Sequence, residues 1–308
     1  PWENSKLLAT AKSAIQLNFS KMEVGQLKQK AQGLKEELNR DQKYIIGCSP
    51  QLMQVMSMVR KVAKTNANII ITGENGTGKE LIAREIHRSS LRNREVMVSV
   101  DMGAVSETLF ESELFGHVKG AFTDARENRA GKFETANKGT LFLDEIGNLS
   151  FHLQAKLLAA IQNRRFMRLG SDKTIPVDIR LVCATNKDLP KMVEEGLFRE
   201  DLLYRINTIQ IEVPPLRERG NDIIVLADFF LKKFTSKYEK HGLKINQAAQ
   251  EKLLKYQWPG NIRELQHTIE KAVILGDSLV LKPDDFFLRP VMSGKYDEQH
   301  LTIEEMEK

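Results

Sequence analysis

A glycine-rich stretch that ends in a lysine carries the clearest chemical signal in this sequence. Gly73, Gly76, Gly78 and Lys79 fit the pattern G-x-x-x-x-G-K, with Glu74, Asn75 and Thr77 between them. Glycines let backbone N–H groups turn inward around phosphate oxygens, and a helix that opens at Lys79 points its positive end at the same place. Lys79 would reach the β- and γ-phosphates of a nucleotide. Glu80 stands where a Ser or Thr ligand of Mg²⁺ usually follows the lysine.

The segments on either side of this loop are those that phosphate binding requires. Ile69, Ile70 and Ile71 form an apolar β-branched run that predicts a buried parallel strand, and residues 80–88 predict a helix. A glycine-rich turn before an ordinary surface helix is the alternative interpretation. The strand, loop and helix in this order favour a site for a nucleoside triphosphate such as ATP.

Two acidic residues close a second apolar run, which begins at Gly139. Asp144 would orient Mg²⁺ there, and Glu145 would polarise the water that attacks the γ-phosphate. Taken alone, the pair could be a simple acidic cap between a strand and a helix. Asn186 follows the next apolar run and could sense the γ-phosphate through its amide, although by itself it would be only a turn residue.

Apolar runs alternate with helical patterns over residues 44–215. The expected strands are residues 69–71, 96–100 (ending at Asp101), 139–145, 178–184 and 206–213. This alternation predicts an α/β nucleotide-binding domain, with a parallel sheet flanked by helices and ligands at the carboxyl ends of the strands.

Only helices are expected in the following part, residues 216–290, after Pro214 and Pro215. Helical patterns cover residues 222–238, 247–256 and 261–275, and Asn261 is a suitable N-cap for the last. These patterns predict a small all-helical domain. Residues 291–308 read as a linker.

Residues 1–43 predict a helical lead-in with a coiled-coil-like seam. Its apolar positions repeat over roughly three heptads and are Leu17, Val24, Leu27, Ala31, Leu34 and Leu38. The seam would pair with a partner helix, as in a dimer, or pack on its own domain. Gly25 and Gly33 weaken the helix.

Composition describes an ordinary soluble protein. The 308 residues suit about two domains, 41% of them are hydrophobic, and 46 basic against 41 acidic residues give a net charge of +5. The charge is too evenly mixed to indicate nucleic-acid binding. Cys48 and Cys183 have no partner motif, so we expect two small buried side chains in a cytoplasmic protein. No stretch is long and apolar enough to span a membrane.

The stretch Glu113-Leu-Phe-Gly-His-Val-Lys-Gly-Ala-Phe-Thr-Asp-Ala125 places Phe115 and Phe122 among glycines. Here the chain resembles the bacterial AAA+ activators of sigma-54 RNA polymerase, the NtrC-like enhancer-binding proteins, which carry Glu-Leu-Phe-Gly-His and Gly-Ala-Phe-Thr-Gly-Ala. The resemblance runs from about Ile45 to Leu288. It includes Gly-Glu-Asn-Gly-Thr-Gly-Lys-Glu, where Glu80 is usual, and three further motifs: Phe198-Arg-Glu-Asp-Leu-Leu-Tyr-Arg-Ile206, Pro214-Pro-Leu-Arg-Glu-Arg219 and Trp258-Pro-Gly-Asn-Ile-Arg-Glu-Leu265.

This resemblance implies a role for each matching position. Asp101 matches a polar residue, more often Asn, that communicates with the catalytic acid Glu145. Arg199 and Arg205 match arginines that reach the γ-phosphate of the neighbouring subunit, and Arg263 matches a sensor in the helical lid. The loop Gly120, Ala121, Phe122, Thr123, Asp124 and Ala125 matches the element that contacts sigma-54. Asp124 replaces the family's glycine in that loop.

The resemblance therefore implies an ATP-hydrolysing ring, with a hexamer expected, that remodels sigma-54 RNA polymerase to open promoters. It also implies a fragment of a two-component response regulator, which would contact DNA only through a domain absent from this chain. Two alternatives remain open at this point. One is a different AAA+ machine, such as an unfoldase or clamp loader, which the loop around Phe122 disfavours. The other is a module that binds ATP without hydrolysing it.

Overall fold

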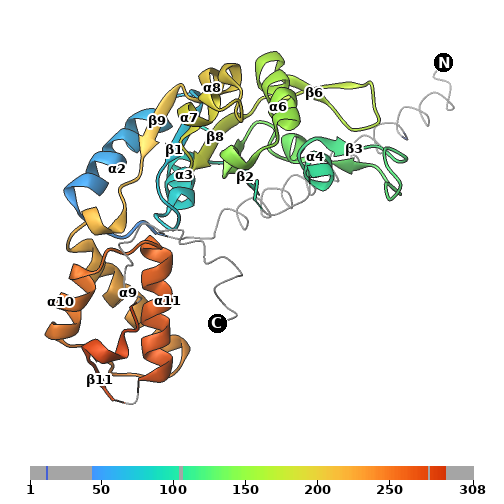
Figure 1. The fold of residues 1–308 in the computed structure, drawn as a ribbon. Helices are drawn as coiled ribbons and strands as arrows, with labels where there is room; N and C mark the ends of the chain where they lie inside the picture. Colours follow the sequence, from blue (N-terminus) through green and yellow to red (C-terminus); the bar gives the residue numbers. More distant parts are fainter. Residues whose placement is uncertain (1–11, 13–43, 104–106, 277, 289–308) are drawn as a thin grey trace, which may run out of the picture. The chain divides into compact units, whose positions relative to one another are not determined.

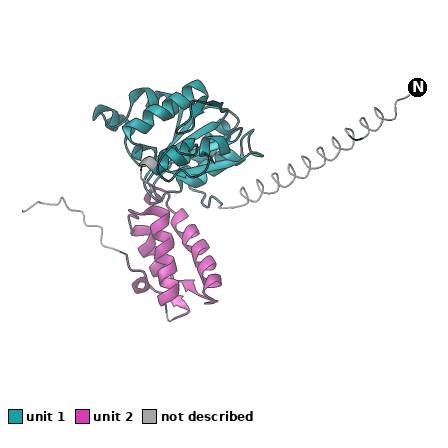
Figure 2. Ribbon diagram, turned by 90° about the vertical axis from the view of Figure 1, so that its right-hand side faces the viewer, with its two compact units in different colours: residues 1–215 teal, residues 216–308 magenta. Residues whose placement is uncertain are grey.

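The computed structural model describes residue 12, residues 44–103, residues 107–276 and residues 278–288. Apart from residue 12, the expected lead-in helix of residues 1–43 lies outside these ranges, as does the expected linker of residues 291–308. The chain divides between Pro215 and Leu216 into two compact units, coloured separately in Figure 2.

The first unit is built on a five-stranded parallel sheet, which confirms the predicted fold class. Its strands are β1 (Ile69–Thr72), β2 (Met97–Asp101), β5 (Thr140–Asp144), β8 (Arg180–Thr185) and β9 (Ile209–Glu212). Their order across the sheet is β2-β5-β8-β1-β9, and every neighbouring pair is parallel. All five apolar runs of the sequence form strands, with small differences at the ends. Figure 1 shows helices on both faces of this sheet.

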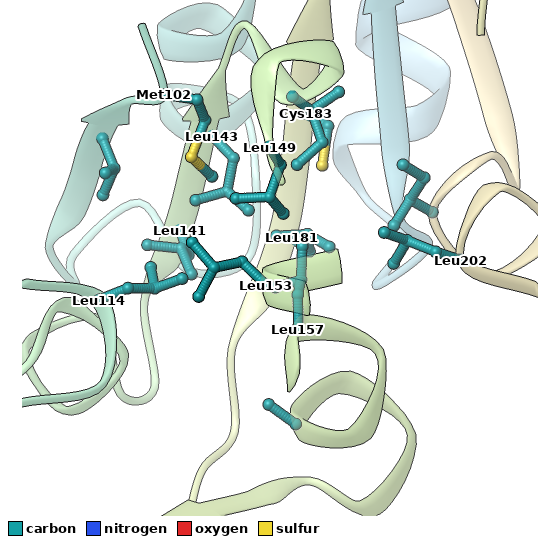
Figure 3. Packing of buried hydrophobic residues seen from close by; sticks show 14 of the residues in the cluster. Met102, Leu114, Leu141, Leu143, Leu149, Leu153, Leu157, Leu181, Cys183 and Leu202 are labelled. Atoms are coloured by element: carbon teal, nitrogen blue, oxygen red, sulfur yellow. The ribbon is translucent and has the colours of Figure 1, made fainter. Parts of the chain in front are cut away.

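Alternate residues of each strand face different layers of helices, because successive side chains of a strand point to opposite faces. On one face, Phe142 and Val182 pack with residues of α2 (Pro50–Ala63) and α3 (Lys79–Arg88). On the other face, Leu141, Leu143 and Leu181 pack with residues of α4 (Glu107–Phe115), α6 (Phe151–Asn163) and α8 (Glu200–Ile206). Figure 3 shows the leucines that fill this second layer. The first unit also contains α5 (Lys132–Thr135), α7 (Leu189–Glu194) and the 3₁₀ turn η1 (Ile146–Asn148).

Two short antiparallel hairpins interrupt the α/β alternation, and the sequence did not predict either. One pairs β3 (Gly116–His117) with β4 (Arg129–Ala130), and the other pairs β6 (Arg165–Met167) with β7 (Thr174–Pro176). Strands of two or three residues are too short for a periodic pattern. Phe115 ends α4 and is buried, with its ring stacked on that of Phe133 at a centroid distance of 5.3 Å.

The second unit contains the three expected helices, α9 (Asp222–Lys237), α10 (Gln247–Lys255) and α11 (Asn261–Leu275), with the 3₁₀ turns η2 (Leu216–Glu218) and η3 (Pro283–Asp285). It is not purely helical as predicted, since β10 (Lys244–Ile245) pairs in parallel with β11 (Val280–Leu281). The predicted N-cap is also wrong. Gly260 caps α11, and Asn261 is its buried first residue, whose Oδ1 accepts a hydrogen bond from Leu216 N at 2.7 Å.

The two cysteines differ in their surroundings. The expectation of a buried side chain is confirmed for Cys183 and wrong for Cys48. Cys183 is buried in β8, where burial raises the pKa of its thiol. Cys48 precedes α2 and is exposed. Among the described helices, none combines the length and apolar character that a membrane span needs.

Candidate nucleotide site

The glycine-rich loop links the carboxyl end of β1 to the first turn of α3. Gly73, Gly76 and Gly78 adopt φ values of 148°, 78° and 98°, which residues with a Cβ atom rarely adopt. A Cβ atom at Gly73 would also lie 2.8 Å from the carbonyl oxygen of Val213. Gly78 is the N-cap of α3. The loop therefore has the backbone form that lets N–H groups surround a phosphate.

Lys79 is nearly buried, with 7% of its surface exposed, and its ammonium group lies within the loop. Its Nζ atom donates to the carbonyl oxygens of Gly73 at 2.9 Å and Glu74 at 3.1 Å. Thr77 stabilises the same turn, because its Oγ1 donates to the Glu74 carbonyl at 2.8 Å. The loop thus holds a positive charge where phosphate oxygens would bind, so the residues present fit a nucleotide.

The side chain of Glu80 forms its hydrogen bonds within α3. Its Oε1 accepts from Nε of Arg84 at 3.0 Å and from a terminal guanidinium nitrogen of Arg84 at 2.7 Å. These bonds join residues one helical turn apart, a spacing that favours such pairs. The arrangement fits a helix-stabilising role for Glu80 beside the site.

Asp144 ends β5 at the same edge of the sheet as the glycine-rich loop. Burial raises the pKa of its carboxyl group, and the carboxylates of Asp101 and Glu145 act in the same direction. The backbone N–H of Glu145 and the ammonium of Lys79 act in the opposite direction. Mg²⁺ is usually held by one or two carboxylates and by substrate phosphates. Asp144 lies at the same edge of the sheet as the glycine-rich loop, and the charge of Lys79 acts on its pKa. Its carboxylate therefore fits that requirement.

Glu145 follows the strand in a left-handed conformation, with φ of 55°. Its Oε2 accepts a hydrogen bond from Nδ2 of Asn148 at 2.6 Å. Asp101, opposite Asp144 in the register of β2 and β5, instead accepts a hydrogen bond from Gly103 N at 2.8 Å. The hydrogen bond to Glu145 thus comes from Asn148, which sequence reasoning missed. Asn148 follows Glu145 by three residues, and this spacing was the signal in the sequence that could have indicated the contact.

Asn186 follows β8, which lies between β5 and β1 in the sheet. Its side chain is exposed at the carboxyl edge that also carries Asp144 and the glycine-rich loop. The sheet order therefore brings together, at one edge, the residues that the sequence placed at three separate strand ends. Arg263 belongs to the second unit, where it is exposed in the first turn of α11.

Both candidate trans arginines belong to α8, Arg199 at its start and Arg205 in its last turn. Arg199 is the N-cap of α8 and binds Asp201 through two hydrogen bonds of 3.0 and 2.7 Å. The carbonyl oxygen of Arg205 accepts from Nδ2 of Asn68, the residue before β1, at 2.8 Å. The structure thus places Arg205 at the amino edge of the sheet, away from the glycine-rich loop of its own chain.

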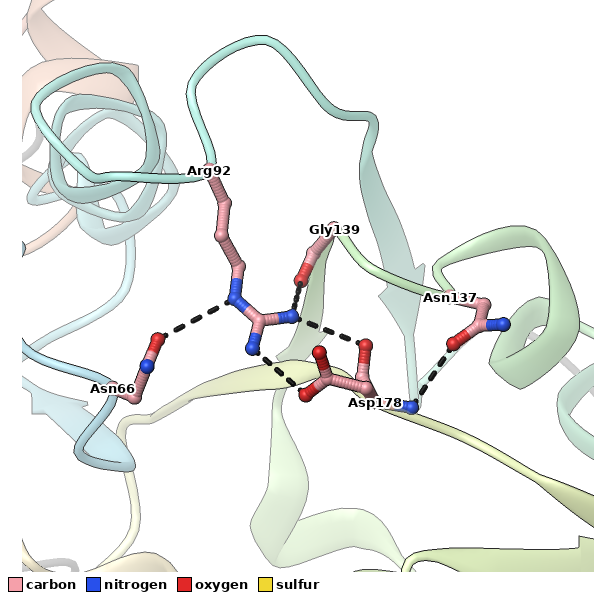
Figure 4. Close-up of polar contacts among 5 residues, drawn as sticks. All are labelled: Asn66, Arg92, Asn137, Gly139 and Asp178. Atoms are coloured by element: carbon pink, nitrogen blue, oxygen red, sulfur yellow. Dashed lines mark hydrogen bonds and ion pairs between the residues drawn. The ribbon is translucent and has the colours of Figure 1, made fainter.

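Arg205 also lines a polar pocket of about 450 Å³ at this amino edge, together with Arg92, Arg164 and Asp178. Figure 4 shows Arg92 bound to Asp178: its guanidinium donates to the carboxylate of Asp178 at 2.8 Å and to its carbonyl oxygen at 3.1 Å. Asn66 accepts from Nε of Arg92 at 3.4 Å. The pocket is therefore a cationic surface with one fixed ion pair.

The loop between β3 and β4 carries the sequence Gly120–Ala125. It is folded on itself, because Gly120 N donates to the Ala125 carbonyl at 2.8 Å and Ala125 N donates to the Phe122 carbonyl at 2.9 Å. Phe122 is 38% exposed, and the edge of its ring contacts His117 at a centroid distance of 4.9 Å. Asp124 is exposed and Ala125 is buried. An aromatic side chain and a carboxylate thus stand at the surface of one compact loop.

The sheet order, the glycine-rich loop and the acids at its edge define a P-loop nucleotide-binding protein of the AAA+ class. Residues 45–212 match the sigma-54 interaction domain, and residues 217–300 match the AAA+ ATPase lid domain. The chain belongs to the sigma-54 interaction domain family, and the resemblance seen in its sequence is confirmed.

Several relatives support this assignment. Regulatory protein AtoC of Escherichia coli strain K12 is 45% identical over 285 residues, which are 92% of this chain and 61% of AtoC. The anaerobic nitric oxide reductase transcription regulator NorR of Citrobacter koseri is 46% identical over 255 residues, which are 81% of this chain and 50% of NorR. The chain thus spans between half and two thirds of these proteins.

A solved structure of NtrX from Brucella abortus in complex with ADP is also similar. Its TM-score is 0.75 at 32% sequence identity, and the match covers 96% of this chain and 65% of NtrX. A second NtrX structure, in complex with ATP, has a TM-score of 0.74 at the same identity. A protein of the same fold therefore holds both nucleotides.

Proposed function

We propose that this chain is the ATP-hydrolysing part of a sigma-54-dependent transcriptional activator, and that it uses hydrolysis to remodel sigma-54 RNA polymerase and open promoters. The observation that carries the proposal is the meeting of Lys79, in its glycine-rich loop, with Asp144 and Glu145 at one edge of the sheet. A loop with the exposed aromatic Phe122 belongs to the same unit.

Lys79 and the N–H groups of its loop bind the triphosphate, and Asp144 is the residue that would hold Mg²⁺. Bound there, the metal would neutralise charge that develops on the phosphates. Glu145 accepts a proton from the attacking water, and Asn186 senses the γ-phosphate. Arg263 contributes from the helical lid. These roles follow from the positions of the residues at the carboxyl edge of the sheet, except that of Arg263, which follows from the family resemblance.

Arg199 and Arg205 act on the nucleotide of a neighbouring subunit in a ring, which we propose is a hexamer. The location of Arg205 at the opposite edge of the sheet from its own glycine-rich loop supports this role. A guanidinium supplied in trans couples hydrolysis to assembly, because no single subunit then holds a complete site. The seam of residues 1–43 would hold a dimer when the ring is absent.

The loop Gly120–Ala125 contacts sigma-54 and moves when the nucleotide is hydrolysed. We further propose that the protein acts in the cytoplasm as part of a two-component system, with DNA contacts made by a domain outside this chain. Relatives whose names describe a regulatory protein and a transcription regulator support a role in transcription regulation.

One experiment separates this function from its alternatives. ATP hydrolysis is measured at increasing protein concentration, with sedimentation and with sigma-54 binding in the presence of a transition-state phosphate mimic. We expect the rate per subunit to rise with assembly and the trapped ring to retain sigma-54. Concentration-independent hydrolysis without sigma-54 binding would favour another AAA+ machine, and binding of ATP without turnover would favour a nucleotide-dependent interaction module.

A further inference from the structure

The carboxylate of Glu145 is held by a single side chain of its own turn. Asn148 donates from Nδ2 to Oε2 of Glu145 at 2.6 Å, which is a short hydrogen bond for a nitrogen donor. Among the described residues, no second donor is bonded to this carboxylate. One oxygen is therefore fixed, and the other remains available to a reactant.

The backbone fixes this contact. Glu145 is left-handed, and the turn η1 that follows closes with a hydrogen bond from Asn148 N to the Glu145 carbonyl at 2.8 Å. Lys187 holds the turn against the end of β8, because its Nζ donates to the Gly147 carbonyl at 3.2 Å. Asn148 itself is exposed, so its side chain contributes little to the core.

Asp101 lies close by but cannot provide the same contact. A methyl group at Gly103 would lie 3.0 Å from Oε2 of Glu145, 3.4 Å from Oδ1 of Asp101 and 3.5 Å from Nδ2 of Asn148. The three side chains therefore meet around Gly103. A carboxylate offers only acceptor oxygens, and Oδ1 of Asp101 already accepts from Gly103 N. Like charges on Asp101 and Glu145 repel, whereas a neutral amide attracts the carboxylate.

We propose that Asn148 is the positioning residue for Glu145, a role that rests on the ATP hydrolysis proposed above. By binding Oε2, Asn148 orients the free oxygen Oε1 for the proton of the attacking water. A catalytic base is commonly oriented by a third group in this way. In this chain, the amide donor to Glu145 comes from the turn after β5, while position 101 of β2 carries an aspartate.

The test measures kcat and KM for ATP hydrolysis, the Kd of a fluorescent ATP analogue and the thermal midpoint of the whole chain. Asn148→Ala is expected to lower kcat by about 10-fold while KM and Kd change less than about twofold, because orientation of the base matters only in the transition state. Asn148→Asp, which adds a negative charge, should lower kcat by about 100-fold. Asn148→Gln keeps the donor and should lie closer to the parent than Asn148→Ala does.

Asn163→Ala, at an exposed asparagine that ends α6, is the matched control and should behave like the parent. Gly103→Ala offers an independent route, because its methyl group would displace the Glu145 carboxylate and should also lower kcat. Unchanged or higher kcat in Asn148→Ala would overturn the positioning role, as would a loss confined to Kd. If the parent chain does not hydrolyse ATP under ring-forming conditions, the proposed function itself fails, and the positioning role fails with it.

Discussion

Lys79 and Arg205 lie beyond opposite ends of the strand β1. Lys79 opens the helix that follows the carboxyl end of β1, whereas the carbonyl of Arg205 is bonded to Asn68, the residue before its amino end. The four residues of β1 separate the two ends by about 13 Å at the usual strand rise. Arg205 is thus remote from the phosphate loop of its own chain, as an arginine that acts between subunits must be.

Mixing two inactive variants tests catalysis in trans. Arg205→Ala and Glu145→Gln subunits should each be nearly inactive alone, and their mixture should regain part of the parent ATPase activity. Some sites of the mixed ring then combine an intact acid with an intact neighbouring arginine. Activity is measured across mixing ratios, with ring assembly checked by sedimentation. Absence of rescue in properly assembled mixed rings would contradict a trans role.

Substitutions of Lys79 and Glu145 should separate the effect on nucleotide binding from the effect on turnover. Lys79→Ala is expected to weaken nucleotide affinity by at least about 10-fold, because the ammonium neutralises phosphate charge in the ground state. Glu145→Gln should bind ATP normally and lose turnover by about 100-fold or more, since it removes only the base. Titration with a fluorescent ATP analogue and a phosphate-release assay measure the two effects. Normal hydrolysis by the glutamine variant would disprove the assignment of Glu145.

Substitutions in the loop Gly120–Ala125 should change sigma-54 binding without changing ATP hydrolysis. Phe122→Ala removes the exposed ring and is expected to abolish retention of sigma-54 by the ring trapped with a transition-state mimic. Asp124→Gly should alter that binding while the ATPase rate stays close to that of the parent, because Asp124 is exposed. We predict that Asp124 adapts the loop to a basic patch on the sigma factor of the same organism. That adaptation is excluded if the parent ring does not bind this sigma factor.

His87 should make the first unit sensitive to acid. Burial lowers the pKa of its imidazole from 6.5 to about 4, while the Glu95 carbonyl, which lies 3.1 Å from Nε2, opposes the shift. Because the folded state holds the neutral ring, the stability that His87 contributes is present above pH 6.5 and is lost as pH falls toward 4. Linkage sets this loss at about 2 kcal/mol by pH 5.

Urea unfolding at pH 8 and pH 5, followed by circular dichroism, measures this effect. His87→Gln should reduce the dependence on pH, whereas His152→Gln, at an exposed histidine, should leave it unchanged. Equal pH dependence in the parent and the His87 variant would show that other groups are responsible. His87 also lies 2.8 Å from Thr140 Oγ1, so the variant should be less stable at both pH values.

Features that depend on contiguous residues were predictable from the sequence. The isoleucines of β1, the glycines with Lys79, and the acids that end β5 each form one short segment whose pattern is set by local backbone geometry. The same holds for the helices α9, α10 and α11, whose apolar stripes repeat every turn. The family resemblance rests on motifs of this contiguous kind.

The tertiary structure alone decided how separate segments meet. The order of the strands brings Asp144 and Asn186 beside the loop of Lys79 and sends Arg205 to the other edge. The left-handed turn at Glu145 selects Asn148 as its partner, and packing turns Asn261 inward to bind Leu216. Strand pairing and buried hydrogen bonds join residues that no local pattern relates, because the burial that fixes them exists only when the whole chain is packed.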